Sequence, residues 1–266
     1  GATVRAFSSD DQPPQPDLSK VAIAPEWSAA PQTLGAGAGA HRLVWDLHYA
    51  PPAGLTAEDP DEPEEGVWAP PGEYRLELKA GGRVYRQLLA VVPDPRITVP
   101  PAAYARQFAL ARDVEGARVE VAAALAAAER IHAAIAERRK GAGTATAGTA
   151  TAGTATAGTA TAGALAAADA RLLAISDLAP EKRSPDSIGR PPTTTAGLRY
   201  LAAAFHSLGR AVDGADAAPT ADAERGYARH RALLERTLAE WKRFTSTDLA
   251  GLNAQLKASG AAVIAP

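Results

Sequence analysis

The spacing of apolar residues changes near Pro100, and this change constrains what the chain can fold into. Before Pro100 short segments alternate apolar and polar residues, most regularly from Glu73 to Lys79, which is the period of a half-buried β-strand. After Pro100 apolar residues recur with the period of about 3.6 that marks one face of an α-helix. The sequence therefore predicts an α+β multidomain chain, with an antiparallel β-sandwich over residues 1–98 and an antiparallel α-helical bundle or long helical hairpin over residues 99–266.

A tight hairpin is the clearest element of the β-rich part. Gly81 and Gly82 form a two-residue turn of the kind that hairpins prefer, because glycine adopts positive φ at both positions. With that turn, Leu78 lies opposite Tyr85, and Glu77 lies opposite Arg86 as a cross-strand ion pair. We expect Arg75, Glu77 and Arg86 to be exposed on one face. The opposite face is expected to be buried in the sandwich and consists of Tyr74, Leu76, Leu78, Tyr85, Leu89 and Val91.

Two further strands are expected before the hairpin. Leu43, Trp45 and Leu47 occupy alternate positions, and Trp45 is the largest candidate for the sandwich core. Thr3–Phe7 is predicted as a short strand with no partner strand before it, so its open edge is expected to favour self-association. Pro93 and Pro95 end the β-rich part, because two prolines this close cannot lie in a central strand.

Several helices are expected after Pro100. The first runs from about Pro101 to Lys140, where Gly141 stops it. Thr195 is a candidate N-cap of the third helix, Pro219–Thr220 opens the fourth, and Thr247 caps a short last piece. Their apolar stripes consist of Leu110, Val114, Ala117, Val121, Ala124, Ala128, Ile131 and Ile135; Leu165, Ala168, Leu172 and Ile175; Leu198, Leu201, Phe205, Leu208 and Val212; Tyr227, His230, Leu234, Leu238, Trp241 and Phe244; and Leu249, Leu252 and Leu256.

Residues 143–162 form a low-complexity repeat of Gly-Thr-Ala-Thr-Ala. A period of five residues matches neither a helix nor a strand, so the repeat builds no apolar face. We predict a flexible loop between the first two helices, whose deletion leaves the thermal midpoint nearly unchanged. The counter-argument is length, because a helical repeat would match the second helix better to the long first one.

Composition excludes several classes of function. The net charge of −2 provides no basic field to recruit nucleic acid or acidic lipid. Cysteine is absent, which rules out disulfides, thiolate metal sites and cysteine nucleophiles. The sequence contains no run of about 18 apolar residues, so no membrane-spanning helix is predicted. Methionine is absent as well, even at position 1, so we expect a processed or truncated product.

No catalytic, cofactor-binding or metal-binding residue is predicted. The five histidines show no metal-ligand spacing, and packing explains His132, His206 and His230, which lie on or beside helix stripes. The sequence contains no nucleophile elbow, phosphate loop or dinucleotide fingerprint.

Two features leave a ligand site open. The acidic run of residues 58–65 could supply two carboxylates for glycoside hydrolysis, or bind calcium weakly, although its prolines favour a solvated loop. Trp27 and Trp68, together with Tyr74, could form an aromatic platform for a sugar. Packing in the core and at the sandwich edge is the simpler interpretation of these rings.

Three motifs occur in an order that resembles a known family. His41–Leu47, Trp68–Tyr74 and Asp94–Arg96 resemble the C-terminal region of large bacterial BNR-repeat, sortilin-like β-propeller proteins, often labelled glycosyl hydrolases. In that family the first motifs belong to an immunoglobulin-like domain, similar to that of flagellar hook-capping proteins, and a helical region follows whose end resembles Thr247–Leu256. The resemblance implies an immunoglobulin-like sandwich lacking its first strand, and a secreted, periplasmic or cell-surface location. It also implies that any glycosyl hydrolase site lies outside this chain.

The sequence and the resemblance together predict a non-catalytic accessory segment of an exported β-propeller protein. Its expected partners are the β-propeller of the same protein and further copies of the chain, through a sheet edge or the helices. A carbohydrate- or peptide-binding module is the alternative, and an exposed tryptophan pair in a groove would favour it. An autonomous hydrolase is a third interpretation, which would require two carboxylates facing each other across a cleft.

Overall fold

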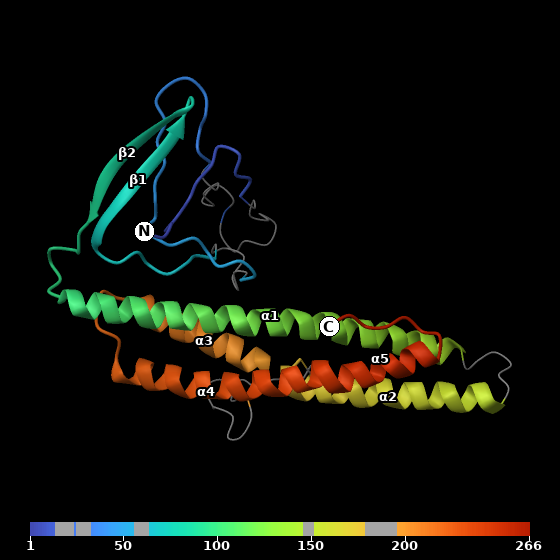
Figure 1. Ribbon diagram of the computed structural model, residues 1–266. Helices are drawn as coiled ribbons and strands as arrows, with labels where there is room; N and C mark the ends of the chain where they lie inside the picture. The colour runs from blue at the N-terminus through green and yellow to red at the C-terminus, as the bar shows by residue number, and fades with distance from the viewer. Residues whose placement is uncertain (14–23, 25–32, 56–63, 146–151, 179–195) are drawn as a thin grey trace. The chain divides into compact units, whose positions relative to one another are not determined.

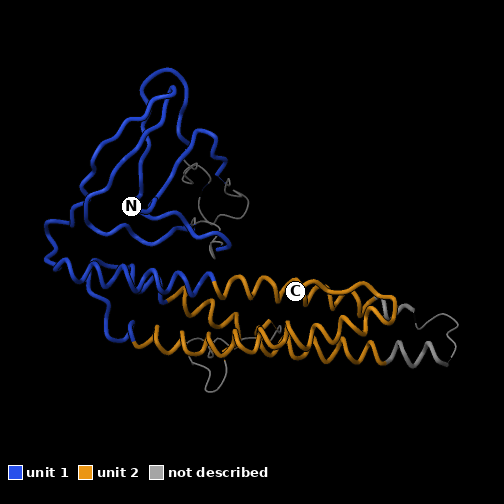
Figure 2. The backbone as a smooth tube through the Cα atoms, in the orientation of Figure 1, with its two compact units in different colours: residues 1–119, 208–224 blue, residues 120–207, 225–266 orange. Residues whose placement is uncertain are grey.

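The computed structural model describes residues 1–13, 24, 33–55, 64–145, 152–178 and 196–266 (Figure 1). The chain divides into two compact units (Figure 2). Unit 1 consists of residues 1–119 and 208–224, and unit 2 consists of residues 120–207 and 225–266. The boundary between the units therefore falls within the helical part of the chain.

The expected hairpin forms in unit 1 with the predicted register. Strands β1 (Gly72–Ala80) and β2 (Arg83–Val91) pair in antiparallel fashion, with Leu78 opposite Tyr85. Gly81 and Gly82 have φ of 56° and 72°, the left-handed conformation that the two-residue turn requires. Arg86 donates to Glu77 at 3.0 Å on the charged face, so the predicted cross-strand ion pair is confirmed.

The predicted β-sandwich is wrong. The described residues form one two-stranded sheet, and the fold is mostly helical. No second sheet formed by the described residues covers the hairpin, and Leu76, Leu78 and Tyr85 are 47%, 50% and 52% exposed rather than buried. Alternation identified the strands correctly, but it does not reveal whether anything packs over them.

The segments expected as further strands are irregular. Between Asp46 and His48, Leu47 has a φ of 64°, which turns the chain out of the extended conformation. An isolated bridge joins His48 to Trp68 in place of a regular ladder. The backbone N–H of Ala50 donates to the carbonyl of Val4 at 3.1 Å, which ties the N-terminal segment to this loop.

Trp45 does not form a sandwich core either. The indole is partly buried, and its ring lies edge-on to Tyr74 with centroids 5.5 Å apart. The indole N–H donates to the carbonyl oxygen of His48 at 2.9 Å. Trp45 therefore links the base of the hairpin to the irregular segment that carries His48.

The helical part is confirmed, and its stripes are largely confirmed. Helices α1 (Pro101–Ala145), α2 (Ala152–Ser176), α3 (Leu198–Asp213), α4 (Ala221–Arg243) and α5 (Leu249–Ala258) follow in order (Figure 1). All the stripe residues expected for the first two helices and the last one are buried. On α3 and α4 the stripes are buried at Leu198, Leu201, Phe205, Val212, Leu234 and Phe244, whereas their other members are partly exposed.

Two helix boundaries differ from expectation. Gly141 does not stop α1, which continues to Ala145. Thr247 does not cap a separate last helix, because α4 runs through a π-helical turn, Phe244–Asp248, directly into α5. The opening of α4 is as expected, since the Thr220 hydroxyl accepts a hydrogen bond from the backbone N–H of Ala223 at 3.1 Å.

The repeat is helical where the structure describes it. Residues 143–145 end α1 and residues 152–162 begin α2, whereas residues 146–151 lie outside the described part. The prediction of a loop over all of 143–162 is therefore wrong at both ends. Helix propagation from the well-packed neighbouring segments adds one hydrogen bond per residue, which offsets the poor propensities of Gly and Thr. The predicted effect of deleting the repeat remains untested.

Polar contacts hold the helices of unit 2 together. The carboxylate of Asp169 on α2 accepts from His132 at 2.7 Å and from Arg139 at 3.1 Å, both on α1. Arg171 on α2 pairs with Asp248 at 2.6 Å. The side chain of Asn253 exchanges two hydrogen bonds, 2.7 and 2.8 Å long, with the backbone of Ile264, which fixes the C-terminal tail on α5. Among the described residues, no helix is long and apolar enough to cross a membrane.

Candidate functional site

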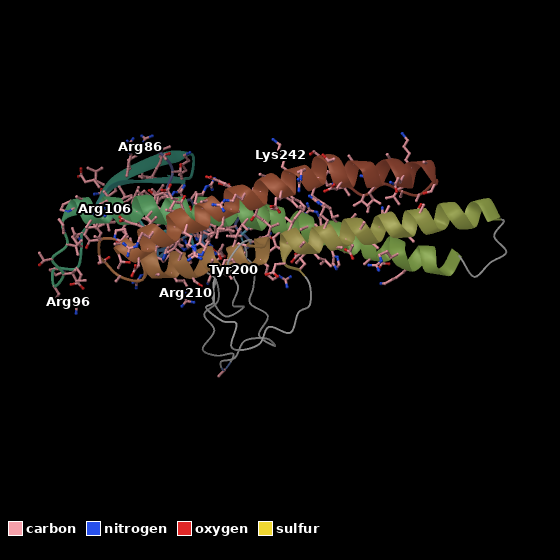
Figure 3. The ribbon with its side chains drawn as sticks, turned by 90° about the horizontal axis from the view of Figure 1, so that it is seen from below. Arg86, Arg96, Arg106, Tyr200, Arg210 and Lys242 are labelled. Atoms are coloured by element: carbon pink, nitrogen blue, oxygen red, sulfur yellow. The ribbon has the colours of Figure 1, made fainter. Side chains whose placement is uncertain are left out.

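A cavity of about 350 Å³ in unit 1 is the candidate ligand site, here called the Trp68 pocket. It lies where the loop before β1, the end of β2, the first turns of α1 and the end of α3 meet. Its lining consists of Leu47, residues 68–71, residues 91–94, Tyr104, Gln107, Phe108 and residues 213–216. The loop from β2 into α1 also carries Arg96 (Figure 3).

Aromatic side chains form much of this pocket. The Trp68 indole packs against the His48 ring at an angle of 41°, with centroids 3.8 Å apart, and remains 46% exposed. Tyr104 is only 8% exposed, and its hydroxyl has no hydrogen-bond partner among the described residues. Burial, together with the nearby charges of Asp216 and Asp94, raises the pKa of Tyr104. The pocket therefore combines an exposed indole with a buried, unsatisfied phenol.

Three carboxylates line the same pocket. Asp94 is paired with Arg96, whose guanidinium approaches to 2.5 Å. Neither Asp213 nor Asp216 has an ion-pair partner in the part of the chain that the structure describes. Burial, and secondarily the charge of Glu115, raises the pKa of Asp213 from 3.8 to about 6. Asp213 therefore carries an uncompensated charge at neutral pH.

Gln107 and Glu115 on α1 hold the walls of the pocket in place. The Gln107 amide donates to the carbonyl oxygens of Val212 and Ala215, both at 2.8 Å, and so fixes the segment that carries Asp213. Glu115 is buried, and it accepts hydrogen bonds from the backbone N–H of Val67, at 3.3 Å, and from Arg112. Burial raises the pKa of Glu115, against the lowering effect of Arg112. These contacts tie Val67, next to the indole, and the chain on either side of Asp213 to one helix.

We expect Asp213→Asn to stabilise the protein at neutral pH. Because burial raises its pKa from 3.8 to about 6, the folded state takes up a proton between these values, and the free energy of unfolding falls as the pH rises through them. Discounted for solvent screening, removal of the charge should add about 1–2 kcal/mol at pH 7. Urea denaturation at pH 4 and pH 7 measures this, with Asp10→Asn at an exposed site as the control. A variant that is less stable than wild type at pH 7 would contradict the expectation.

A second cluster contains His48, whose ring packs against the Trp68 indole. Asp46, His48 and Glu65 can each offer one metal-ligand atom, all within 4.8 Å of one another. However, Nδ1 of His48 faces Asp46 at 3.8 Å, and Nε2 faces Glu65 at 3.3 Å. Because the two carboxylates approach different ring nitrogens, the arrangement suits an imidazole ring held between two carboxylates better than an ion bound by all three residues.

Of the three aromatic residues predicted as a ligand platform, the two that the structure describes do not come together. Trp68 lies in the pocket, whereas Trp27 lies outside the described residues. Tyr74 is not part of a platform with Trp68, since its ring packs on Trp45 and its hydroxyl donates to the carbonyl oxygen of Pro70 at 2.5 Å.

The acidic run is described only at its end. Residues 58–63 lie outside the described part, Glu64 pairs with Arg118 at 2.9 Å, and Glu65 faces His48. Both described carboxylates therefore have structural partners, and neither faces the other across a cleft that the structure describes. Tyr104 and Asp213 were missed, because no sequence motif marks either of them.

The apolar face of the hairpin is the second candidate. This hairpin face consists of the apolar Tyr74, Leu76, Leu78, Tyr85, Leu89 and Val91, with Gln87 opposite Leu76 among them. Its exposure rises toward the Gly81–Gly82 turn, because Tyr74, Leu89 and Val91 at the base are partly buried and the other three are exposed. Arg86 belongs to the opposite, charged face and is labelled in Figure 3. The hairpin face is therefore apolar surface without an observed cover.

Comparison with known proteins identifies no relative. No protein-family model, no curated protein and no solved structure matches the chain.

Proposed function

We propose that the chain is a non-catalytic accessory segment of an exported protein, which docks on a partner domain through the hairpin face. The exposure of Leu76, Leu78 and Tyr85, at 47%, 50% and 52%, carries this proposal. A two-stranded hairpin in water is marginally stable by itself, so an apolar face of this kind gains stability when a partner covers it. Contiguous apolar patches on a protein surface mark interaction sites.

The partner is a β-propeller of the same polypeptide. The order of the motifs His41–Leu47, Trp68–Tyr74 and Asp94–Arg96, which resembles the region after such propellers, supports this choice. The two faces of the hairpin also differ in the way that docking requires. One is apolar apart from Gln87. The other carries the Glu77–Arg86 pair and Lys79, which suit contact with water, beside the exposed Val84 and Leu88.

The docking proposal is tested by a matched pair of hairpin variants. Leu78→Glu places a charge on the hairpin face, and Leu88→Glu places the same charge on the opposite face, where Leu88 is 65% exposed. Binding of each purified chain to the β-propeller of its parent polypeptide is measured by isothermal titration calorimetry. We expect Leu78→Glu to weaken binding at least about tenfold, because a buried unpaired charge is costly, and Leu88→Glu to leave it nearly unchanged.

Three results would overturn this proposal. One is the absence of binding by the wild-type chain, and another is equal loss in both variants. The third is a wild-type dimer in sedimentation experiments that Leu78→Glu alone dissociates, because the hairpin face would then bind a second copy of the chain.

The Trp68 pocket favours a second candidate function, a ligand-binding module. An exposed indole beside a cavity of about 350 Å³ is the observation that favours it, since cavities of this size accommodate small ligands. The two functions are compatible, because the pocket and the hairpin face use different side chains except for Val91.

A further inference from the structure

The charge of the Trp68 pocket restricts the class of ligand that it can take. Asp94, Asp213 and Asp216 line the pocket, and none of its described lining residues is a lysine, arginine or histidine. An anionic ligand would therefore meet only repulsion. Because Arg96 already neutralises Asp94, the unbalanced negative charge belongs to Asp213 and Asp216.

The aromatic side chains of the pocket also favour a cationic ligand. Trp68, Tyr104 and Phe108 line the pocket beside these carboxylates. An aromatic ring attracts a cation over its face, and tryptophan does so most strongly. The Trp68 indole is available for this contact, since its exposed fraction is 46% even with the His48 ring packed against it.

A buried polar group without a partner provides an independent indication of a ligand. The Tyr104 side chain is more than nine-tenths buried, and its hydroxyl makes no hydrogen bond to any residue that the structure describes. A buried hydroxyl without a partner costs about 1–3 kcal/mol, so its oxygen is suited to accept a hydrogen bond from a ligand. Asp94 and Asp216 act on the same phenol, which places it within the field of the acidic residues.

We propose that the Trp68 pocket binds an alkylammonium group, as in a lysine side chain of a peptide or in a polyamine. The ammonium group pairs with Asp213, Asp216 lies next to it, and the aliphatic chain lies against Trp68 and Phe108. The Tyr104 oxygen accepts one of the three ammonium hydrogens. Gln107 acts as a positioning residue, because its two hydrogen bonds fix the backbone on either side of Asp213. A neutral sugar would leave the charge of Asp213 uncompensated.

The proposal is tested by titration calorimetry with two ammonium probes and one neutral analogue. The probes are Nα-acetyl-lysine amide and spermidine, and the analogue is Nα-acetyl-norleucine amide, which keeps the aliphatic chain without the charge. We expect both probes to bind and the analogue to bind at least about tenfold more weakly. The tighter of the two probes identifies the source of the ammonium group.

Variants assign the binding to this pocket. Asp213→Asn should weaken binding of the tighter probe roughly tenfold, and Trp68→Ala should weaken it several-fold. Urea denaturation of Asp213→Asn at pH 7, where this variant is expected to be the more stable one, separates loss of binding from unfolding. The exposed Asp10→Asn is the matched control and should leave the affinity unchanged.

The pH dependence is a further readout that a purely structural role of Asp213 would not produce. The titratable groups that act on Asp213 or share its pocket are Glu115 and Tyr104 on α1, Asp94 and Asp216. Because the pKa of Asp213 is about 6, affinity for the probe should rise about tenfold from pH 5 to pH 7 in the wild type and stay flat in Asp213→Asn. The absence of probe binding, equal binding of the norleucine analogue, or an unchanged affinity in Asp213→Asn would overturn the proposal.

Discussion

Replacement of both His132 and Arg139 by alanine should lower the free energy of unfolding by about 3 kcal/mol. Both side chains donate from α1 to the carboxylate of Asp169 on α2, which is only 6% exposed. Without them the carboxylate stays buried with no cation, and desolvation of an unpaired charge is among the largest costs that a substitution can impose. Urea denaturation followed by circular dichroism measures the loss.

A third substitution, Asp169→Ala, tests whether the loss comes from the unpaired carboxylate. The two donors are themselves partly exposed, with side-chain exposures of 38% for His132 and 51% for Arg139. Asp169→Ala alone therefore leaves two polar side chains that water can reach, and it should cost less than the double variant. Addition of Asp169→Ala to the double variant should restore part of the stability, which a double-mutant analysis detects. Glu137→Ala, which removes an exposed ion pair with Lys140, is the control and should be nearly neutral. A triple variant that is less stable than the double one would contradict this account.

The helical part of the fold was predictable because helix burial follows directly from sequence period. Leu110 to Ile135 on α1 occupy positions three or four residues apart, and each stripe residue among them is buried. The many alanines in this stripe do not weaken the pattern, since small side chains allow neighbouring helices to approach closely. What the period did not predict is where helices end, because Gly141 costs only about 1 kcal/mol in a helix interior.

The β-rich part was only half predictable for a different physical reason. Gly81–Gly82 and the alternation around it define the pairing register, and the structure has that register. Burial of the hairpin face depends on a second layer, and no local signal in Tyr74–Val91 specifies one. The left-handed backbone at Leu47, which prevents a regular strand there, is equally invisible, since leucine rarely adopts this conformation.

The sequence identified only one residue of the candidate pocket as a possible ligand contact. Trp68 stands out as a large aromatic residue beside two prolines, but Tyr104 and Asp213 come from helices that are far apart in sequence. Asp213 directly follows the stripe residue Val212, so sequence alone presents it as the ordinary polar end of a helix. Its raised pKa arises from burial and from Glu115, almost a hundred residues earlier in the chain, and only the folded structure brings these groups together.

Phe205→Ala should cause the larger loss of stability, about 3–5 kcal/mol. The Phe205 side chain on α3 is fully buried, and its ring meets Tyr227 and His230 of α4 edge-on, with centroids 6.3 and 6.0 Å apart. The substitution removes the transfer free energy of the ring and leaves a cavity. The helices around it cannot fill this cavity, because their stripes are already packed. Urea denaturation with detection at 222 nm measures the loss.

Val263→Ala is the control for Phe205→Ala, because Val263 belongs to the same unit and is 54% exposed. It should change the free energy of unfolding by less than about 0.5 kcal/mol. The two variants together test whether the buried stripes, rather than apolar content as such, stabilise unit 2. A loss below about 1 kcal/mol for Phe205→Ala would mean that α3 and α4 can close the cavity. In that case the contact between these two helices would not be the rigid scaffold that the packing of Phe205 indicates.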